Sequence, residues 1–278
     1  MRPLILQTEE VYQFKLQGFS AASGLIIQGD RLFCVADDEL GLVSIPMTLE
    51  GPEAWIPLFP GQLPEDPIAR KKTKPDIEIL VELPEARTIL GLPSGSTPFR
   101  DRGVLVDSNQ QVNPLSFSRT YEALRKKIPE LNLEGAVVTD GRIRLFQRGN
   151  GQEGFNGIFD LPLSDFLADR PGSFQFQPVD LGLSADQSPW GFTDACLDGD
   201  SIWFLAVSEA SRSTYHDGSY GGAKLGRMDL SGRVLEIHSL DVPHKPEGLA
   251  LYRNSFYLVT DADDRKVSSR IYRVCFSH

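Results

Sequence analysis

Two stretches of the sequence share one pattern: EGAVVTDGRIRLFQR at residues 134–148 and EGLALYRNSFYLVTD at residues 247–261. Each begins with Glu-Gly, continues with apolar residues, reaches an Asp-Gly or Arg-Asn pair, and ends with a second apolar run. A short polar turn between two such runs is typical of a β-hairpin. Each stretch therefore predicts a hairpin whose first strand starts at an acidic residue.

The hairpin pattern recurs five times along the chain, at intervals of 53 to 60 residues, with starts at Ser23, Glu78, Glu134, Asp194 and Glu247. Polar residues mark the end of the second strand in every repeat, at Asp37, Ser94, Arg148, Ser208 and Asp261. This period fits a four-stranded propeller blade. We therefore predict an all-β fold, a five-bladed β-propeller forming a single domain over residues 1–278, with a six-bladed ring as the alternative.

Apolar runs between the repeats predict the remaining strands. Third strands are expected at residues 41–46, 102–106, 157–161, 224–229 and 269–274, and outer strands at 54–59, 174–179 and 234–240. The last repeat has only three strands, so we expect residues 1–22 to complete the last blade and close the ring. Residues 118–128 have helical spacing at Tyr121, Leu124 and Ile128, which predicts a short surface helix capped by Ser118 or Thr120.

Composition excludes several classes of function. The chain has 28 Lys and Arg against 38 Asp and Glu, a net charge of −10, which is unfavourable for binding a phosphate backbone. No apolar run is long enough for a membrane span or a signal peptide. The three cysteines are isolated, as expected for buried thiols in a reducing compartment. We expect a cytoplasmic monomer that binds a small molecule and neither nucleic acid nor membrane.

Strand direction gathers the polar landmarks at one mouth of the propeller. In an up-and-down blade, the start of the innermost strand, the end of the second strand and the following loop share a face. The loops on this face, at residues 94–102, 149–154, 208–222 and 261–268, are polar and mostly Gly- or Ser-rich. Loops held by a rigid scaffold commonly carry function. We therefore place the functional site at this mouth.

The carboxylates expected around the axis repel one another and need a counter-charge. One solution is Ca²⁺, which takes oxygen ligands without one contiguous motif; its candidate ligands are Glu78, Glu134, Asp194 and Glu247. The other is pairing with bases on the same face, which are also candidates for gripping an anionic ligand: Lys74, Arg100, Arg102, Arg148 and Lys245, with Ser94 beside them. A third possibility is that each acidic residue has a purely structural role and hydrogen-bonds the adjoining backbone at the start of its blade.

Proton transfer at this mouth has two candidates. Asp261 ends the second strand of the last repeat, and His244 lies three residues before Glu247. A carboxylate or an imidazole near the mouth fits a general acid or base. For His244, an ordinary surface or loop-anchoring role fits better than proton transfer.

Four phrases carry a family resemblance: KPDIEIL (74–80), SGSTPFRDRGVLV (94–106), LNLEGAVV (131–138) and KPEGLALY (245–252). Together they resemble an uncharacterised bacterial propeller family of unknown function. More distantly, the Glu-Gly repeats are similar to esterase-like phytase and lactonase-type propellers, which implies axial carboxylates that bind calcium and support hydrolysis. Ser23, Asp194 and Arg148 depart from that pattern.

The first functional hypothesis is a metal-assisted hydrolase of a small phosphate ester, ester or lactone. The alternatives are a propeller that binds a small ligand or glycan without turnover, and a protein-interaction scaffold that uses an outer face or the helix at residues 118–128.

Overall fold

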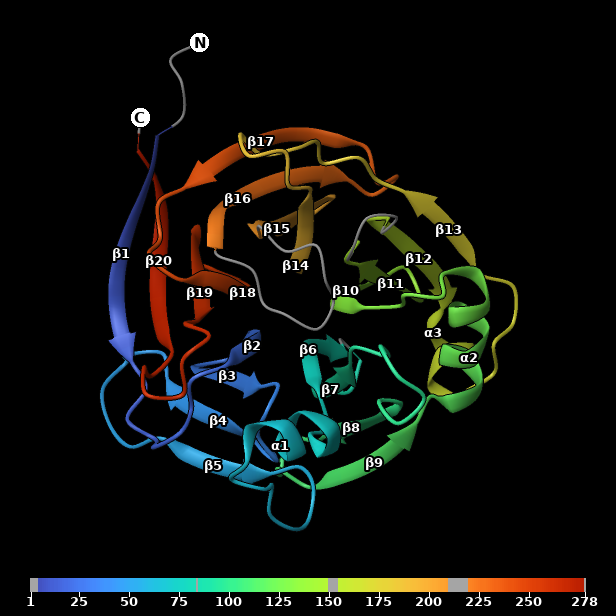
Figure 1. Cartoon of the computed structure of the whole chain (residues 1–278), viewed down its shortest axis with the longest axis horizontal. Helices are drawn as coiled ribbons and strands as arrows, with labels where there is room; N and C mark the ends of the chain where they lie inside the picture. Colours follow the sequence, from blue (N-terminus) through green and yellow to red (C-terminus); the bar gives the residue numbers. More distant parts are fainter. Residues whose placement is uncertain (1–4, 84, 150–154, 210–219, 278) are drawn as a thin grey trace.

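The computed structural model describes residues 5–83, 85–149, 155–209 and 220–277. Five four-stranded antiparallel sheets stand around a central axis, so the five-bladed prediction is confirmed (Figure 1). From inner to outer strand, the first four blades are β2 (Ala22–Gln28), β3 (Arg31–Ala36), β4 (Gly41–Pro46) and β5 (Ala54–Pro57); β6 (Ile77–Leu83), β7 (Thr88–Pro93), β8 (Arg102–Val106) and β9 (Val112–Ser116); β10 (Leu133–Thr139), β11 (Arg142–Gln147), β12 (Gly157–Pro162) and β13 (Gln175–Pro178); and β14 (Trp190–Asp198), β15 (Ser201–Glu209), β16 (Tyr220–Asp229) and β17 (Val234–Leu240).

The fifth blade joins both ends of the chain. Its inner strands are β18 (Lys245–Tyr252), β19 (Ser255–Asp261) and β20 (Arg270–Ser277), and its outer strand is β1 (Ile5–Gln13). β1 pairs antiparallel with β20 from Ile5–Ser277 to Gln13–Arg270. The predicted closure of the ring by the N-terminal segment is confirmed, and it gives the last blade its fourth strand.

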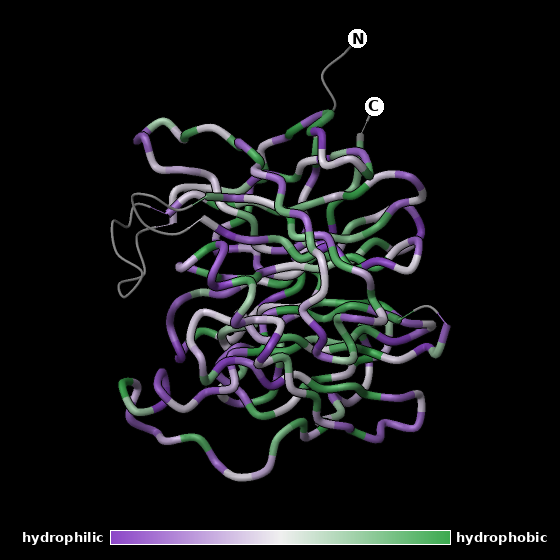
Figure 2. The backbone as a smooth tube through the Cα atoms, turned by 90° about the vertical axis from the view of Figure 1, so that its right-hand side faces the viewer, coloured by the Kyte–Doolittle hydropathy of each residue, from purple (hydrophilic) through white to green (hydrophobic). Residues whose placement is uncertain are grey.

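The hydrophobic core consists of five clusters, each between two neighbouring blades. Between the third and fourth blades, for example, the rings of Phe146, Phe192 and Phe204 pack edge to face. In Figure 2 the hydrophobic residues run through the strands of the interior, and many connecting loops are hydrophilic. Packing between all neighbouring pairs fixes the ring as one unit, which holds the inner strands rigidly about the axis.

Each inner strand contains a β-bulge near its first residues, and these bulges explain the repeat. The register against the second strand shifts so that one residue or more lacks a partner: Ser23 with Gly24, Glu78, Glu134, Thr193 and Glu247. A bulge places an extra residue in one strand and re-aims its side chain. In the second, third and fifth blades the recurring acidic residue is therefore the bulged residue of the inner strand.

The glycines that follow the bulged residues allow neighbouring inner strands to approach. A Cβ on Gly24 would lie 2.6 Å from the backbone nitrogen of Leu80, and one on Gly248 would lie 2.1 Å from the carbonyl oxygen of Ser23. Gly135 makes the corresponding approach to Ala195. Only Gly fits where two backbones come this close. The Glu-Gly pair thus combines a side chain directed by a bulge with a packing contact between blades.

The described residues form three helices outside the blades. α2 (Ser118–Lys127) confirms the predicted surface helix, and Tyr121 and Leu124 are fully buried. Its predicted cap is wrong: the N-cap is Phe117, and the first backbone N–H groups donate to the carboxylate of Asp169 instead. α1 (Pro67–Thr73) and α3 (Leu163–Leu167) were not predicted. Among the described residues, no helix is long and apolar enough to cross a membrane.

Candidate functional site

A cavity of about 350 Å³ opens at the mouth where the inner strands begin. Its lining is strongly charged, with eight acidic and five basic side chains, an excess of three negative charges if all are ionised. All five blades contribute to it. Seven of the ten polar landmarks of the repeats line it; Ser94, Asp194 and Ser208 do not.

One side of the cavity, which we call the α1 wall, is built by the first two blades and the segment around α1. It consists of Asp37, Lys71, Lys74, Asp76, Glu78 and Arg100. α1 lies between β5 and β6 in the chain and is drawn over the first two blades in Figure 1. Lys71 belongs to α1 and Lys74 is its C-cap, and both line the cavity. Three acids meet three bases here, so the formal charges on this wall balance.

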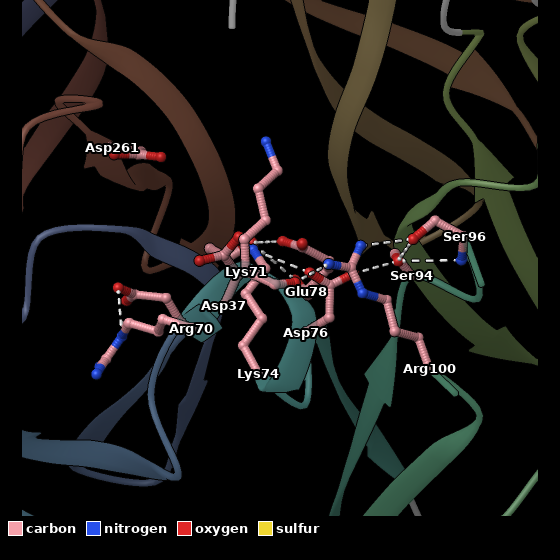
Figure 3. A network of polar contacts seen from close by, with 12 residues as sticks. Asp37, Arg70, Lys71, Lys74, Asp76, Glu78, Ser94, Ser96, Arg100 and Asp261 are labelled. Atoms are coloured by element: carbon pink, nitrogen blue, oxygen red, sulfur yellow. Dashed lines mark hydrogen bonds and ion pairs between the residues drawn. The ribbon is translucent and has the colours of Figure 1, made fainter. Parts of the chain in front are cut away.

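Lys74 and Arg100 hold the carboxylates of the α1 wall together (Figure 3). The Lys74 ammonium contacts Asp37 and lies 2.9 Å from Asp76 Oδ1, while Arg100 Nη1 lies 3.0 Å from Asp76 Oδ2. Asp37, Asp76 and Glu78 have oxygens within 4.8 Å of one another, which is metal-like spacing. Because the Lys74 ammonium already bonds two of these three carboxylates, it supplies the counter-charge that a metal would bring.

The pKa values on this wall follow from burial and pairing. Burial would raise the pKa of Asp76, but Lys74 and Arg100 outweigh it and hold that pKa below its usual value. Glu78 has no such direct base; Ser23 Oγ donates to it at 2.5 Å, and burial raises its pKa well above the usual range. Asp76 therefore stays ionised, whereas Glu78 favours its protonated form.

The opposite side, which we call the acidic wall, comes from the last three blades. It consists of Glu134, Arg148, Glu209, Lys245, Glu247 and Asp261. Four acids meet two bases, an excess of two negative charges. Most of the charge imbalance of the cavity therefore lies on this wall.

Arg148 and Lys245 bridge the carboxylates of three blades. Arg148 Nη2 lies 3.0 Å from Glu209 Oε1, and Nη1 lies 3.5 Å from Glu134 Oε1 and 3.6 Å from Glu247 Oε1. Lys245 lies 3.1 Å from Glu247 Oε1 and 3.2 Å from Glu209 Oε1. The two bases therefore converge on Glu209, and their attraction outweighs burial and lowers its pKa to about 2.

The other acids on this wall are poorly compensated. Burial raises the pKa of Glu134 to about 8, a shift that Arg148 reduces but does not remove and that Glu247 increases. Burial also raises the pKa of Glu247 and, well above its usual range, that of Asp261, which lies 4.0 Å from Lys245. Within the described part of the chain, buried Glu247 Oε2 has no hydrogen-bond partner.

The donor set of the acidic wall suits a hard divalent cation. Its ligand atoms are all oxygens and the wall carries uncompensated negative charge. Buried Glu247 Oε2 makes neither a hydrogen bond nor an ion pair with the described residues. Glu134 and Glu247 would hold such a cation, with Asp261 nearby. The α1 wall fits less well because Lys74 and Arg100 already neutralise it.

Eight of the twelve predicted site residues line the cavity: Lys74, Glu78, Arg100, Glu134, Arg148, Lys245, Glu247 and Asp261. Ser94 is one step removed; it is buried, and its hydroxyl donates to Asp76. Arg102 begins β8 with an exposed side chain, and His244 precedes β18; neither lines the cavity. Within the predicted loops 149–154 and 208–222, residues 150–154 and 210–219 lie outside the described part of the chain.

Asp194 is placed differently from its predicted role. The bulged residue of the fourth blade is Thr193, whose hydroxyl donates to the carbonyl of Pro246, so Asp194 stands one residue out of phase with the other acids. Its carboxylate accepts the backbone N–H groups of Ala195 and Leu249, both at 2.7 Å. Asp194 therefore fastens the fourth blade to the fifth and does not line the cavity.

Sequence reasoning missed six polar residues of the cavity. Lys71, Asp76, Ser96, Glu130, Asn132 and Glu209 all line it. Asp76 and Asn132 lie two residues before a bulged Glu, the position that Lys245 holds in the last blade. This shared position, two residues before the bulged Glu, was the sequence signal that could have identified Asp76 and Asn132 as site residues. Glu209 is the residue after the predicted landmark Ser208, and β15 has a register shift at this point, so Glu209 and not Ser208 lines the cavity.

Solved structures with the same overall architecture include several enzymes. Glutaminyl cyclase from Myxococcus xanthus has a TM-score of 0.55 at 11% identity over 100% of both chains. A putative glycoside hydrolase from Parabacteroides distasonis has 0.52 at 11%, covering 98% of this chain and 93% of that one, and the PQQ-bound aldose sugar dehydrogenase from Streptomyces coelicolor has 0.51 at 12%, covering 99% of each. At such identities the likeness concerns the fold alone.

The sequence comparisons identify the family. No curated protein matches the chain significantly in sequence. Residues 18–275, almost the whole chain, match a family of unknown function, DUF6929. This span includes every bulged residue and both walls of the cavity, and it agrees with the resemblance to an uncharacterised propeller family. The protein with this axial cavity is thus a member of the family of unknown function DUF6929.

Proposed function

We propose that the protein is a hydrolase of a small ester, phosphate ester or lactone, acting in the axial cavity with the help of a divalent cation. The observation that carries the proposal is the buried Glu247 Oε2, which has no hydrogen-bond partner in the described residues, on a wall with two uncompensated negative charges. Lys245 and Arg148 contact Oε1 of Glu247, so its second buried oxygen is left without a partner, which is costly. A cation bound at Glu247 Oε2, with Glu134 nearby, would remove that cost.

The residues around the cavity have distinct roles in this proposal. A bound divalent cation would polarise a carbonyl or phosphoryl oxygen and activate water. Arg148 fixes Glu134 and Glu247 from one side, and Lys245 fixes Glu247 from another. Asp261, whose pKa burial raises, would exchange a proton with the reacting water or leaving group.

Calorimetric titration of metal-free protein with Ca²⁺, Mg²⁺ and Mn²⁺ tests the cation. We expect at least one to bind, and the Glu134→Gln/Glu247→Gln double variant to abolish binding. Glu122→Gln, a change on the exposed face of α2, is the matched control and should bind normally. If wild type binds none of the three metals, the metal-assisted reaction is rejected.

Turnover is tested separately with p-nitrophenyl acetate, p-nitrophenyl phosphate and a γ-lactone, in the presence of the metal that binds best. We expect at least one to be hydrolysed, and Asp261→Asn to lower kcat at least tenfold with metal affinity retained. Metal binding without turnover of all three classes would reject the hydrolase.

A second candidate function is binding without turnover. The α1 wall favours it, because its ion pairs form a rigid surface with balanced charge around a cavity at the lower end of the usual range for small-ligand sites. A ligand that raises the melting temperature without being consumed would support this function.

A further inference from the structure

Lys71 stands apart from the other bases of the cavity. Lys74, Arg100, Arg148 and Lys245 each contact a carboxylate, whereas Lys71 makes no ion pair with any described residue. In Figure 3 the Lys71 side chain rises from α1 with its ammonium group away from the bonded network. It is an available positive charge at the mouth.

The position of Lys71 is nevertheless fixed by its backbone. Arg100 Nη2 donates to the Lys71 carbonyl oxygen at 3.0 Å, which ties α1 to the loop between β7 and β8. Arg70 anchors the same turn of helix through Asp38 at 3.2 Å and through Glu39. The chain therefore holds the root of the Lys71 side chain in place and leaves its ammonium free.

A second cavity, of about 230 Å³, adjoins the axial one. Both are lined by Asp37, Lys71, Lys74, Lys245 and Asp261. Lys74 and Lys245 are committed to carboxylates on either side. Lys71 is thus the base at the junction that can contact a ligand without breaking an ion pair among the described residues.

We propose that Lys71 binds an anionic oxygen group of the substrate, a phosphoryl or carboxylate group, at the junction of the two cavities. This inference rests on the proposed function and narrows its substrate to a molecule that carries an anion. The substrate would then lie across the cavity, with its anionic end at the α1 wall and its reacting centre toward Glu134 and Glu247. The positive charge of Lys71 attracts the anionic end, and the negative excess of the acidic wall repels it, so both favour this orientation.

The negative charge of the acidic wall should affect how tightly an anion binds at Lys71. Its excess of two negative charges repels an anion elsewhere in the same cavity. A divalent cation on that wall removes the excess, so it should strengthen anion binding at Lys71. The two sites are expected to be positively coupled, and coupling of this kind is reciprocal.

The test uses inorganic phosphate and acetate as probes, titrated into full-length protein with and without Mg²⁺. We expect at least one probe to bind more tightly with Mg²⁺, and Lys71→Ala to weaken that binding about fivefold, the effect of one partly exposed charge pair. Lys72→Ala is the matched control: Lys72 is the next residue of α1, is exposed and lines neither cavity. It should bind like wild type.

Each outcome is decisive. Equal affinities for Lys71→Ala and wild type, or no binding of either probe to wild type, would overturn the anion site and leave the metal site standing if Mg²⁺ still binds. Lys71-dependent binding in a protein that binds no metal would preserve the anion site and reject the metal-assisted reaction. The tighter of the two probes identifies the group as phosphoryl or carboxylate.

Discussion

Replacing Glu134 with Gln should stabilise the metal-free protein, and more so as the pH rises. Burial raises the pKa of Glu134 from 4.5 to about 8. A carboxyl whose folded pKa lies above its unfolded value binds protons more tightly when folded, so its contribution to stability is lost as the pH rises from 4.5 through 8. At pH 8 that loss corresponds to about 4 kcal/mol, and Gln, which cannot ionise, avoids it.

The replacement keeps the local hydrogen bond. Asn132 Nδ2 donates to Glu134 Oε1 at 2.5 Å, and the Gln carbonyl can accept the same bond. The long contact of 3.5 Å from Arg148 is the main interaction that weakens. Because Arg148 retains Glu209 at 3.0 Å, its own charge stays compensated.

Urea unfolding at pH 5 and pH 8, with EDTA present, measures the effect. We expect similar midpoints for Glu134→Gln and wild type at pH 5, and a higher midpoint for the variant at pH 8 with an unchanged m-value. Glu122→Gln should match wild type at both. In the absence of EDTA, adding the metal that binds should raise the urea midpoint of wild type but not that of Glu134→Gln. A variant that is less stable than wild type at pH 8, or a difference independent of pH, would refute the reasoning.

Three more predictions follow from single contacts. Glu209→Gln should lower the free energy of unfolding by about 3 kcal/mol at pH 7, because folding lowers the pKa of Glu209 from 4.5 to about 2. The stabilisation by the ionised Glu209 is present above pH 4.5 and is lost as the pH falls toward 2. The urea midpoints of variant and wild type should therefore converge in acid. Asp194→Asn should lower the free energy of unfolding by about 1–3 kcal/mol in the same assay and leave metal affinity intact. The Asn side chain has one carbonyl oxygen in place of the two carboxylate oxygens that each accept a buried N–H. A loss of metal binding in a folded variant would contradict the structural role of Asp194. Gly248→Ala should cost about 1–3 kcal/mol or prevent folding, because its Cβ would lie 2.1 Å from the Ser23 carbonyl oxygen; a melting temperature equal to that of wild type would show that the inner strands are less closely packed.

The sequence predicted the ring well because a repeat is read from many positions at once. The turns Asp140-Gly141 and Arg253-Asn254 do adopt the left-handed backbone that such hairpins need. α1 was missed although Asp66 caps it and Pro67 begins it, both recognisable helix-start signals. Three of its seven residues, at positions 70–72, are consecutive bases. So short and charged a segment has too little apolar periodicity to be recognised as a helix.

The site was harder to predict because bulges change which face a residue takes. Asp194 matches the acidic landmark in type, yet the bulge falls at Thr193, and a shift of one residue turns the side chain from the cavity to the neighbouring backbone. Lys71 and Asp76 carry their roles through contacts between loops of different blades. Such contacts depend on tertiary geometry that local spacing does not contain.

The bulges also separate two tasks within each inner strand. A bulged residue has no partner in the strand ladder, so its identity contributes little to the pairing that holds the blade. Four of these side chains, Ser23, Glu78, Glu134 and Glu247, line the cavity and can therefore be exchanged without loss of strand pairing. A designer could install new chemistry at the mouth by altering these four together, since they contact one another or share Arg148, while the strands, the glycines behind them and the clusters between blades keep the ring intact.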